Sequence, residues 1–419
     1  MDKEFVKLLE SASLEDVFLV AVSGGPDSMA LLHKLRNYPN KFVVCHVNYK
    51  TRNESDYEEK LVRNYSLAND MIFETSIAAK NDITNFQDSA RVFRYSFFQS
   101  MYQKYHAKGL VVAHHLDDAL ETYLMQKERG SIVRHYGIAP ISQVMGMKIY
   151  RPLLNYRKND LLNYCIDNGV KYSIDYTNNL PKYKRNKLRL EIINQLNEES
   201  FNSLVDEMQE KEKENQNLFL QIDKYYLSCV NNDYLDIAQL KKVPLEYQSY
   251  VLYCYLERRI YRSSKVLSAA YLQELCKQVQ DGRPNKQYSI DKKYILYQEY
   301  GLLHIEENKT IDYCYYLNKN EELETKYFRV SKTGDNKNGI YIKDDEYPIV
   351  IRNYKDGDEL LLENGRKKVR RWFIDKKVPI SKRKRIPLLI TNQGKIIYIP
   401  GLFKDFERKN LKSTLFMIE

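Results

Sequence analysis

The stretch "VFLVAVSGGPDSMALLHKL" (residues 17–35) decides the fold, because a strand pattern, a glycine-rich turn and a helix pattern follow one another directly. Val17–Val22 is a run of apolar and small residues typical of a buried strand, and Ser28–Arg36 has a helical pattern. Between them lies "SGGPDS" (residues 23–28). Its two glycines let the backbone approach another group closely, and a proline suits the first helical turn.

The turn has the chemistry of a phosphate cradle. Backbone N–H groups around Gly24, Gly25 and Pro26, at the start of a helix, can bind anionic oxygens, and Ser23 and Ser28 add hydroxyl donors. The Gly-Lys-Ser/Thr ending of a kinase-type loop is missing, and Asp27 stands near the place of that lysine. A carboxylate repels phosphate, so we predict that Asp27 carries Mg²⁺ against the phosphates. An ordinary glycine-rich turn is the alternative.

The residues that follow predict an α/β fold. Strand-like runs at Lys41–Asn48, Met71–Ile77 and Leu110–Ala113 alternate with helical patterns at Asp56–Ala68, Phe86–Tyr105 and Asp117–Lys127. This alternation indicates a Rossmann-like parallel sheet covered on both faces, whose ligands bind at the carboxyl edge. The segments "SGGPDS", "HVNYKTR" and "AHHLDD" each follow a strand, so we expect them to meet at that edge.

The chain changes character twice, which predicts three domains. Residues 1–200 form the nucleotide-binding catalytic domain. Residues 201–320 have few glycines and prolines and are predicted to be a helical middle domain. After the polar segment "VSKTGDNKNG", residues 340–419 have the short strands and turns of a small α+β domain.

Composition limits the function classes. The 419 residues carry a formal net charge of +10, which favours a polyanionic partner such as nucleic acid. No run of 18 apolar residues occurs, so we expect no membrane span. Six scattered cysteines without a C-x-x-C pair fit the cytoplasm and argue against a disulfide scaffold or a zinc site.

Several motifs together resemble one family. "SGGPDS" is similar to the loop of the N-type ATP pyrophosphatases (PP-loop enzymes), which cleave ATP between the α and β phosphates. Further motifs narrow the resemblance: "NFQDSARVFRYSFF" (85–98), "VVAHHLDDALETYLMQKERGS" (111–131), "RPLLNYRKNDLLNYC" (151–165), "IDYTNNLPKYKRNKLR" (174–189) and "VRRWFIDKKVPISKRKRIPLLI" (369–390). Over residues 17–196 and about 345–405 the chain resembles the tRNA(Ile)-lysidine synthetases.

The resemblance implies a ligase that uses ATP and Mg²⁺. Such an enzyme adenylates C2 of the wobble cytidine, C34, in an isoleucine tRNA with a CAU anticodon. The ε-amine of free L-lysine then displaces AMP, and the lysidine that results changes codon reading from AUG to AUA. The partners implied are this tRNA and lysine; a homodimer is left open.

The resemblance also assigns residues. Asp27, His115, Asp118 and Glu121 are the implied catalytic groups. Asp118 and Glu121 share a helix face, where two carboxylates can hold an ammonium, and the resemblance makes them the lysine site. His46 lies beside the implied adenine pocket. The groups implied to contact phosphate or tRNA are Arg91, Arg94, Arg185, Asn186, Arg189, Lys382, Arg383, Lys384 and Arg385.

Other interpretations stay open at this point. The acids of "HHLDD" also suit helix capping or a His/Asp metal site, and the arginines also suit a solvated helix face. His46 also suits a structural role. The basic stretch Arg366–Arg385 contains eleven lysines and arginines, which also suits a solvated surface. A tRNA thiolase with the same ATP chemistry is the alternative function, although Cys45 has no C-x-x-C companion. An RNA-binding protein without activity is the third.

Overall fold

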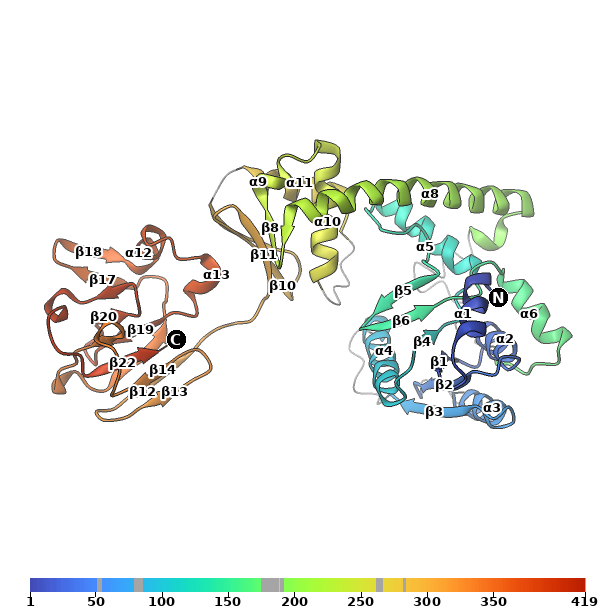
Figure 1. Cartoon of the computed structure of the whole chain (residues 1–419), viewed down its shortest axis with the longest axis horizontal. Coiled ribbons are helices and arrows are strands. Elements are labelled where there is room, and N and C mark those ends of the chain that lie inside the picture. Colours follow the sequence, from blue (N-terminus) through green and yellow to red (C-terminus); the bar gives the residue numbers. More distant parts are fainter. Residues whose placement is uncertain are drawn as a thin grey trace. The chain divides into compact units, whose positions relative to one another are not determined.

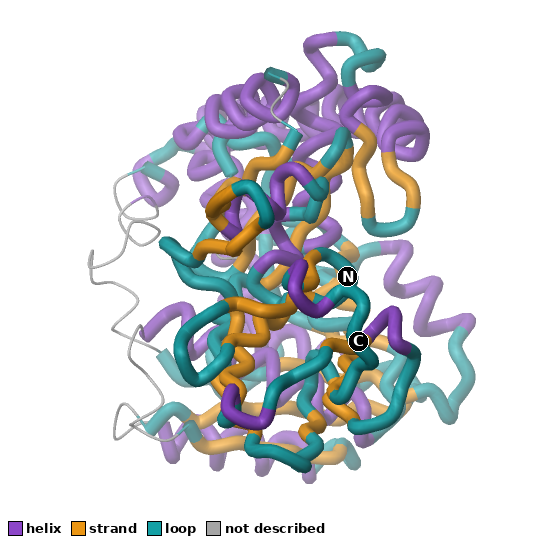
Figure 2. Tube along the Cα trace, turned by 90° about the vertical axis from the view of Figure 1, so that its left-hand side faces the viewer, coloured by secondary structure: helices purple, strands orange, loops and turns teal. Residues whose placement is uncertain are grey.

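The computed structural model describes residues 1–50, 55–78, 86–174, 188, 192–260, 267–281 and 284–418. The chain divides into two compact units, which are described separately below: residues 1–221 with 266–270, and residues 222–265 with 271–419. Helices and strands are both present along most of the molecule (Figure 2). The predicted division into three domains stays a prediction.

The first unit contains the predicted parallel sheet (Figure 1). Its order is β3-β2-β1-β4-β6-β5, and only the last pair is antiparallel among the described strands. The strands are β1 (Val17–Ala21), β2 (Lys41–Asn48), β3 (Ile72–Ile77), β4 (Gly109–Val111), β5 (Ile141–Val144) and β6 (Met147–Tyr150). The first four lie where the sequence predicts them. The apolar runs of β1, β2 and β4 are buried, whereas β3, at the edge of the sheet, is only partly buried.

Helices cover both faces of this sheet. One buried cluster joins β1, β2 and β4 to α1, α2, α3 and α6; the other joins their opposite faces to α4. The helices are α1 (Lys3–Ser11), α2 (Pro26–Leu35), α3 (Ser55–Leu67), α4 (Phe86–Lys104), α5 (Leu116–Arg129) and α6 (Lys158–Asp167). The α/β prediction is therefore confirmed. The β5–β6 hairpin and helices α1 and α6 were not predicted.

The middle region has the predicted helices and also a sheet that the sequence analysis missed. The helices are α8 (Glu198–Cys229), α9 (Ile237–Leu240), α10 (Leu245–Arg259) and α11 (Ala269–Gln280). The strands are β7 (Val230–Asn231), β8 (Tyr234–Asp236), β9 (Asn285–Ser289), β10 (Tyr294–Glu299) and β11 (Leu302–Glu307), in the order β7-β8-β11-β10-β9. Before α8, residues 189–191 fall outside the described residues, and Ile193–Gln195 is a 3₁₀ turn.

The last part of the chain is the predicted small α+β region. A five-stranded sheet has the order β12-β16-β19-β20-β21, a four-stranded sheet has the order β13-β14-β22-β15, and β17 pairs with β18. The strands are β12 (Cys314–Leu317), β13 (Leu323–Glu324), β14 (Arg329–Ser331), β15 (Gly339–Ile340), β16 (Ile349–Asn353), β17 (Glu359–Leu362), β18 (Gly365–Lys368), β19 (Pro387–Ile390), β20 (Ile396–Ile399), β21 (Phe403–Lys404) and β22 (Leu415–Ile418). Two short helices, α12 (Val369–Asp375) and α13 (Ile380–Arg383), carry part of the basic stretch.

Candidate active site

The glycine-rich turn joins β1 to α2 at the carboxyl edge of the sheet. Gly24 has φ +93°, a conformation that side chains disfavour, and its carbonyl accepts a hydrogen bond from Ser173 N at 2.8 Å. The Ser28 hydroxyl donates to the carbonyl of Gly25 at 3.0 Å and accepts from Ser23 N at 3.2 Å. The turn is thus fixed by its own residues, with two serine hydroxyls 3.2 Å apart beside the helix start.

Helix α2 begins as the sequence predicts. Gly25 is its N-cap, Pro26 occupies the first turn, and Asp27 is an acid in that turn. The helix dipole favours an acid here by about 0.3–1 kcal/mol. The Asp27 side chain is about a quarter exposed, at 27%, and lies 3.8 Å from Nε2 of His115. The glycine-rich turn and the junction between β4 and α5 therefore meet through these two side chains.

His115 stands among three carboxylates. Its Nε2 lies 3.4 Å from Asp118 and 3.8 Å from Asp27, and its Nδ1 lies 3.5 Å from Asp117. Burial alone would lower the pKa of His115, but the hydrogen bond with Asp117 and the charges of Asp118 and Asp27 outweigh it, so the pKa is raised. The pKa of Asp117 is lowered: burial opposes this, while His115 and the Lys158 N–H favour the carboxylate. The three carboxylates thus stabilise the protonated form of His115.

Helix α5 begins at this cluster. His115 is its N-cap, and the His115 backbone N–H donates to the Asp118 carboxylate at 3.2 Å. The capping role considered from the sequence is therefore present, together with the ion pairs to His115. Glu121, one turn further on, is 0% exposed. A buried carboxylate requires a polar or charged partner.

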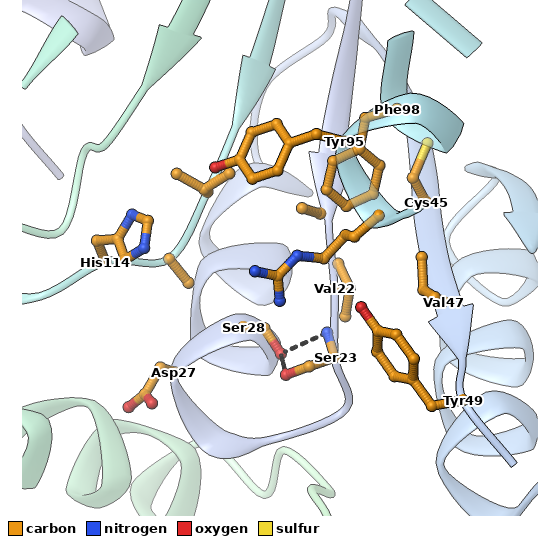
Figure 3. A pocket seen from close by; sticks show the side chains of 14 residues that line it. Val22, Ser23, Asp27, Ser28, Cys45, Val47, Tyr49, Tyr95, Phe98 and His114 are labelled. Carbon is orange, nitrogen blue, oxygen red and sulfur yellow. Dashed lines mark hydrogen bonds between the residues drawn. The ribbon is translucent and has the colours of Figure 1, made fainter. Parts of the chain in front are cut away.

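A cavity of about 230 Å³ lies beside the loop (Figure 3). Its lining combines polar groups of the loop, Ser23, Asp27 and Ser28, with the basic side chain of Arg94 and with His114. The remaining walls are mostly apolar or aromatic: Ala21, Val22, Cys45, Val47, Tyr49, Tyr95, Phe98, Val112 and Ala113. A small polar end and a larger apolar wall suit a nucleotide, whose phosphates and base differ in the same way.

Of the two arginines predicted on α4, one lines the cavity. Arg94 belongs to its wall, whereas Arg91 is outside the lining and lies over the ring of Tyr95, 5.0 Å from its centroid. Sequence reasoning missed His114, Tyr49 and Tyr95. A signal for His114 and Tyr49 was available, because both lie just beyond the end of a strand, where ligands bind in such folds.

His46 lies on the other side of its strand. Cys45 and Val47 line the cavity, so the intervening His46 points to the opposite face. It is buried, and its Nδ1–H donates to the Val22 carbonyl at 2.9 Å. Burial lowers its pKa, partly offset by that hydrogen bond. The structure thus places His46 as a support for the end of β1, outside the cavity.

Comparison with known proteins gives the family. A PP-loop domain model matches residues 1–196, and a TilS substrate C-terminal domain model matches residues 349–415. A tRNA(Ile)-lysidine synthase of Mycoplasma mycoides is 29% identical over 394 residues, which cover 91% of this chain and 95% of the relative. That of Bacillus subtilis is 29% identical, covering 92% and 90%. That of Mesoplasma florum is 31% identical, covering 87% and 92%.

The chain belongs to the tRNA(Ile)-lysidine synthase family. The resemblance predicted from the motifs is therefore confirmed. Since members of this family are ligases, the membership also decides between the ligase and the thiolase interpretations. Burial raises the pKa of the Cys45 thiol, which is the reverse of what a reactive thiolate needs.

The basic stretch of this lysidine synthase family member is not uniformly exposed. Lys382 and Lys384 are exposed, and Arg385 is exposed but forms an ion pair with Glu306. Arg383 is only 6% exposed, and its Nε and Nη2 donate to the Val378 carbonyl at 3.1 and 3.0 Å. Arg383 is thus placed as part of the local structure, and Lys382 and Lys384 are the exposed cations of this segment that form no ion pair with another described residue.

Three predicted residues, Arg185, Asn186 and Arg189, lie outside the described residues. In the part of the chain that is described, no three or more His, Cys, Asp or Glu side chains are arranged so that they could hold a metal ion, and no helix is long and apolar enough to cross a membrane. Asp27 alone still fits Mg²⁺, because this ion is commonly bound by one or two carboxylates together with substrate phosphates.

Proposed function

We propose that this chain forms lysidine on isoleucine tRNA with a CAU anticodon, using ATP and free L-lysine. In the first step the C2 oxygen of the wobble cytidine, C34, attacks the α-phosphorus of ATP, and pyrophosphate leaves. In the second step the ε-amine of lysine attacks C2, the C2–O bond breaks, AMP leaves, and the nitrogen loses its proton. The modified tRNA then reads AUA instead of AUG.

One observation carries the proposal: the SGGPDS loop and the His115 cluster share Asp27. The Asp27 carboxylate lines the cavity and lies 3.8 Å from His115. An ATP in the cavity, with its phosphates at the N-terminus of α2, is thus within reach of the groups proposed to handle lysine. Asp27 would hold Mg²⁺, which supplies positive charge against the phosphates during bond cleavage.

The acids of α5 support a lysine site. Asp118 and Glu121 are one helical turn apart, and Asp118 contacts His115. Two carboxylates can bind the ammonium of lysine, but only the neutral amine attacks C2. A base close to the ammonium is therefore required, and His115 and the two acids are the groups in place to take that proton.

The basic stretch supports tRNA binding away from the anticodon. We propose that the C-terminal region, residues 340–419, contacts tRNA phosphates through Lys382 and Lys384, and that the middle region, residues 201–320, connects it in the chain to the catalytic region, residues 1–200. Arg91 and Arg94, and Arg185, Asn186 and Arg189, are proposed to contact phosphate near the active site. We further propose that the enzyme is cytoplasmic. Whether it forms a homodimer, which the sequence does not decide, can be measured by analytical ultracentrifugation.

The test is incorporation of labelled lysine into tRNA. The purified chain, with ATP and Mg²⁺, should label isoleucine tRNA bearing CAU and release AMP and pyrophosphate in equal amounts. Asp27→Ala should abolish pyrophosphate release. Glu121→Ala should raise the KM for lysine while leaving lysine-independent adenylation intact. Sulfur incorporation without lysine incorporation refutes the proposal, and unchanged lysine kinetics in Glu121→Ala removes that residue from the site.

A further inference from the structure

Arg151 is a buried arginine whose donors are used inside the protein. It follows β6 and is 9% exposed. Its Nη1 donates to the carbonyl of Ala139 at 2.7 Å and to the hydroxyl of Ser142 at 2.9 Å, and its backbone N–H donates to the Pro140 carbonyl at 3.0 Å. Its Nε donates to Nδ1 of His114 at 3.2 Å. One side chain therefore joins the 139–142 segment to a histidine of the cavity wall.

The contact with Arg151 decides where His114 carries its proton. A guanidinium is always charged and can only donate hydrogen bonds. Nδ1 of His114 must therefore be the acceptor, and a neutral imidazole with an acceptor at Nδ1 carries its proton on Nε2. A second proton would have to displace the Arg151 N–H and would place another positive charge beside a guanidinium.

Apart from Asp27, the groups around His114 favour the same state. From α4 the cavity receives the cation Arg94 and the ring of Tyr95; from the end of β2 it receives Cys45 and Tyr49. Burial raises the pKa of both Cys45 and Tyr49, so they stay neutral. Asp27, from α2, is the carboxylate among the described lining residues and acts in the opposite direction, because a negative charge favours an imidazolium; Figure 3 shows it on the side of the cavity away from Tyr49.

We propose that Arg151 is a positioning residue that holds His114 as the neutral Nε2–H tautomer, so that this N–H donates to the ATP bound in the cavity. The tautomer follows from the contacts of Arg151 alone. Donation to ATP rests in addition on the proposed function. An N–H fixed in this way is a hydrogen-bond donor that costs no reorganisation when the nucleotide arrives.

The tautomer is tested without nucleotide, by nitrogen NMR of the full chain labelled at histidine. The signals of His114 are identified by their loss in His114→Gln. We expect an unprotonated Nδ1 and a protonated Nε2, unchanged over about pH 5.5 to 8, the range in which an ordinary imidazole titrates. A protonated Nδ1, or a titrating His114, overturns the proposal, and this measurement requires no Arg151 variant to fold.

Two variants separate positioning from bracing of the 139–142 segment. Arg151→Gln removes the positive charge and the Nε–H that donates to His114, whereas Ser142→Ala removes one contact of Arg151 and leaves His114 untouched. In Arg151→Gln we expect a titrating His114 and a KM for ATP raised about tenfold or more, with the KM for tRNA unchanged. Arg151→Lys, which keeps a cationic donor, should recover part of the ATP affinity. Ser142→Ala should behave as the parent.

The outcomes are distinct. Equal losses in Ser142→Ala and Arg151→Gln mean that Arg151 only braces the segment, and the proposal is overturned. An Arg151→Gln protein whose His114 spectrum matches the parent overturns it as well. If the parent has the Nε2–H tautomer but incorporates no lysine, the proposed function fails while the role of Arg151 for His114 stands.

Discussion

A methyl group added at Gly25 tests whether the loop binds phosphate through its backbone. Gly25 has φ −75° and ψ 166°, which alanine adopts without strain. Among the described residues, a Cβ built there would meet only the Ser23 hydroxyl, at 3.6 Å, an ordinary contact. Alanine is a poorer N-cap than glycine but loses less chain entropy on folding, and each effect is at most about 1 kcal/mol. The net change in the free energy of unfolding should stay within about 1 kcal/mol.

ATP binding should respond much more strongly in Gly25→Ala. A phosphate oxygen must come within about 2.9 Å of a backbone nitrogen to accept its hydrogen bond, and the new methyl group would stand beside the Ser23 hydroxyl that lines the cavity. Loss of one hydrogen bond to a charged group costs about 1.5–3 kcal/mol. The KM for ATP should therefore rise about ten- to a hundredfold, because about 1.4 kcal/mol corresponds to a factor of ten.

The assay is pyrophosphate release as a function of ATP concentration, with thermal unfolding measured on the same protein. Gly146→Ala, in the turn between β5 and β6, is the control. Gly146 has φ +78°, and an added Cβ meets no described residue within 4 Å. It should lose about 1–2 kcal/mol of stability from backbone strain and keep its KM for ATP. A folded Gly25→Ala protein with the parent KM refutes the phosphate cradle.

Three further predictions concern charge. Asp117→Asn removes the hydrogen bond that raises the pKa of His115, so the imidazole should lose its proton at lower pH. Because a base must be unprotonated to accept the lysine proton, the acid limb of the lysine-incorporation profile should move to lower pH. An unchanged profile contradicts this assignment. The double substitution Lys382→Ala with Lys384→Ala should raise the KM for tRNA. The slope of log tRNA affinity against log salt concentration should become shallower by about 0.9 for each phosphate that is no longer neutralised. The control pair Lys3→Ala with Lys7→Ala on α1 should change neither quantity, and an equal loss of ATP affinity in the first pair would mean that the basic stretch is structural. Arg408→Met breaks the buried ion pairs with Glu346 and Asp405 and should lower the free energy of unfolding, measured in urea, by about 3–5 kcal/mol. Lys409→Ala, which breaks an exposed ion pair at the next residue, should lower it by less than about 1 kcal/mol. Arg408 and other donors outweigh burial and lower the pKa of Glu346, so the stability it contributes is present above the usual 4.5 and is lost as pH falls through the lowered pKa. In Arg408→Met the free energy of unfolding should therefore fall less steeply than in the parent as the pH is lowered below the usual pKa of glutamate.

The sequence predicts the sheet edge well because each element there depends on local patterns. The apolar run of β1, the glycine pair and Pro26 place the start of α2 within two residues. The start of α5 is likewise marked by two acids directly after an apolar strand. Such signals lie within a few residues of the feature that they predict.

The middle sheet escapes prediction because its strands are short and polar. The strand β9 has the polar sequence "NKQYS". In β11, buried and exposed residues do not alternate regularly, since the neighbours Leu303 and His304 are both buried. These strands are fixed by antiparallel pairing with β10, a non-local interaction. A strand of this kind has no apolar period from which it could be recognised.

The direction of single side chains is equally hidden from sequence. Four consecutive cations, residues 382–385, look alike, yet Arg383 turns back to the Val378 carbonyl. The contact between Arg151 and His114 joins residues 37 positions apart. Charge counting therefore predicts that a surface binds RNA, and only the packing says which of its cations are available.

The placement of the cysteines has a practical consequence. Five of the six are buried, including Cys45 in the wall of the cavity beside the glycine-rich turn, and Cys314 on β12 is exposed. Maleimide reagents should therefore modify Cys314 first and leave the nucleotide site intact. The natural chain thus offers a single position for a fluorophore, in the same compact unit as the basic stretch, from which tRNA binding can be followed without engineering the protein.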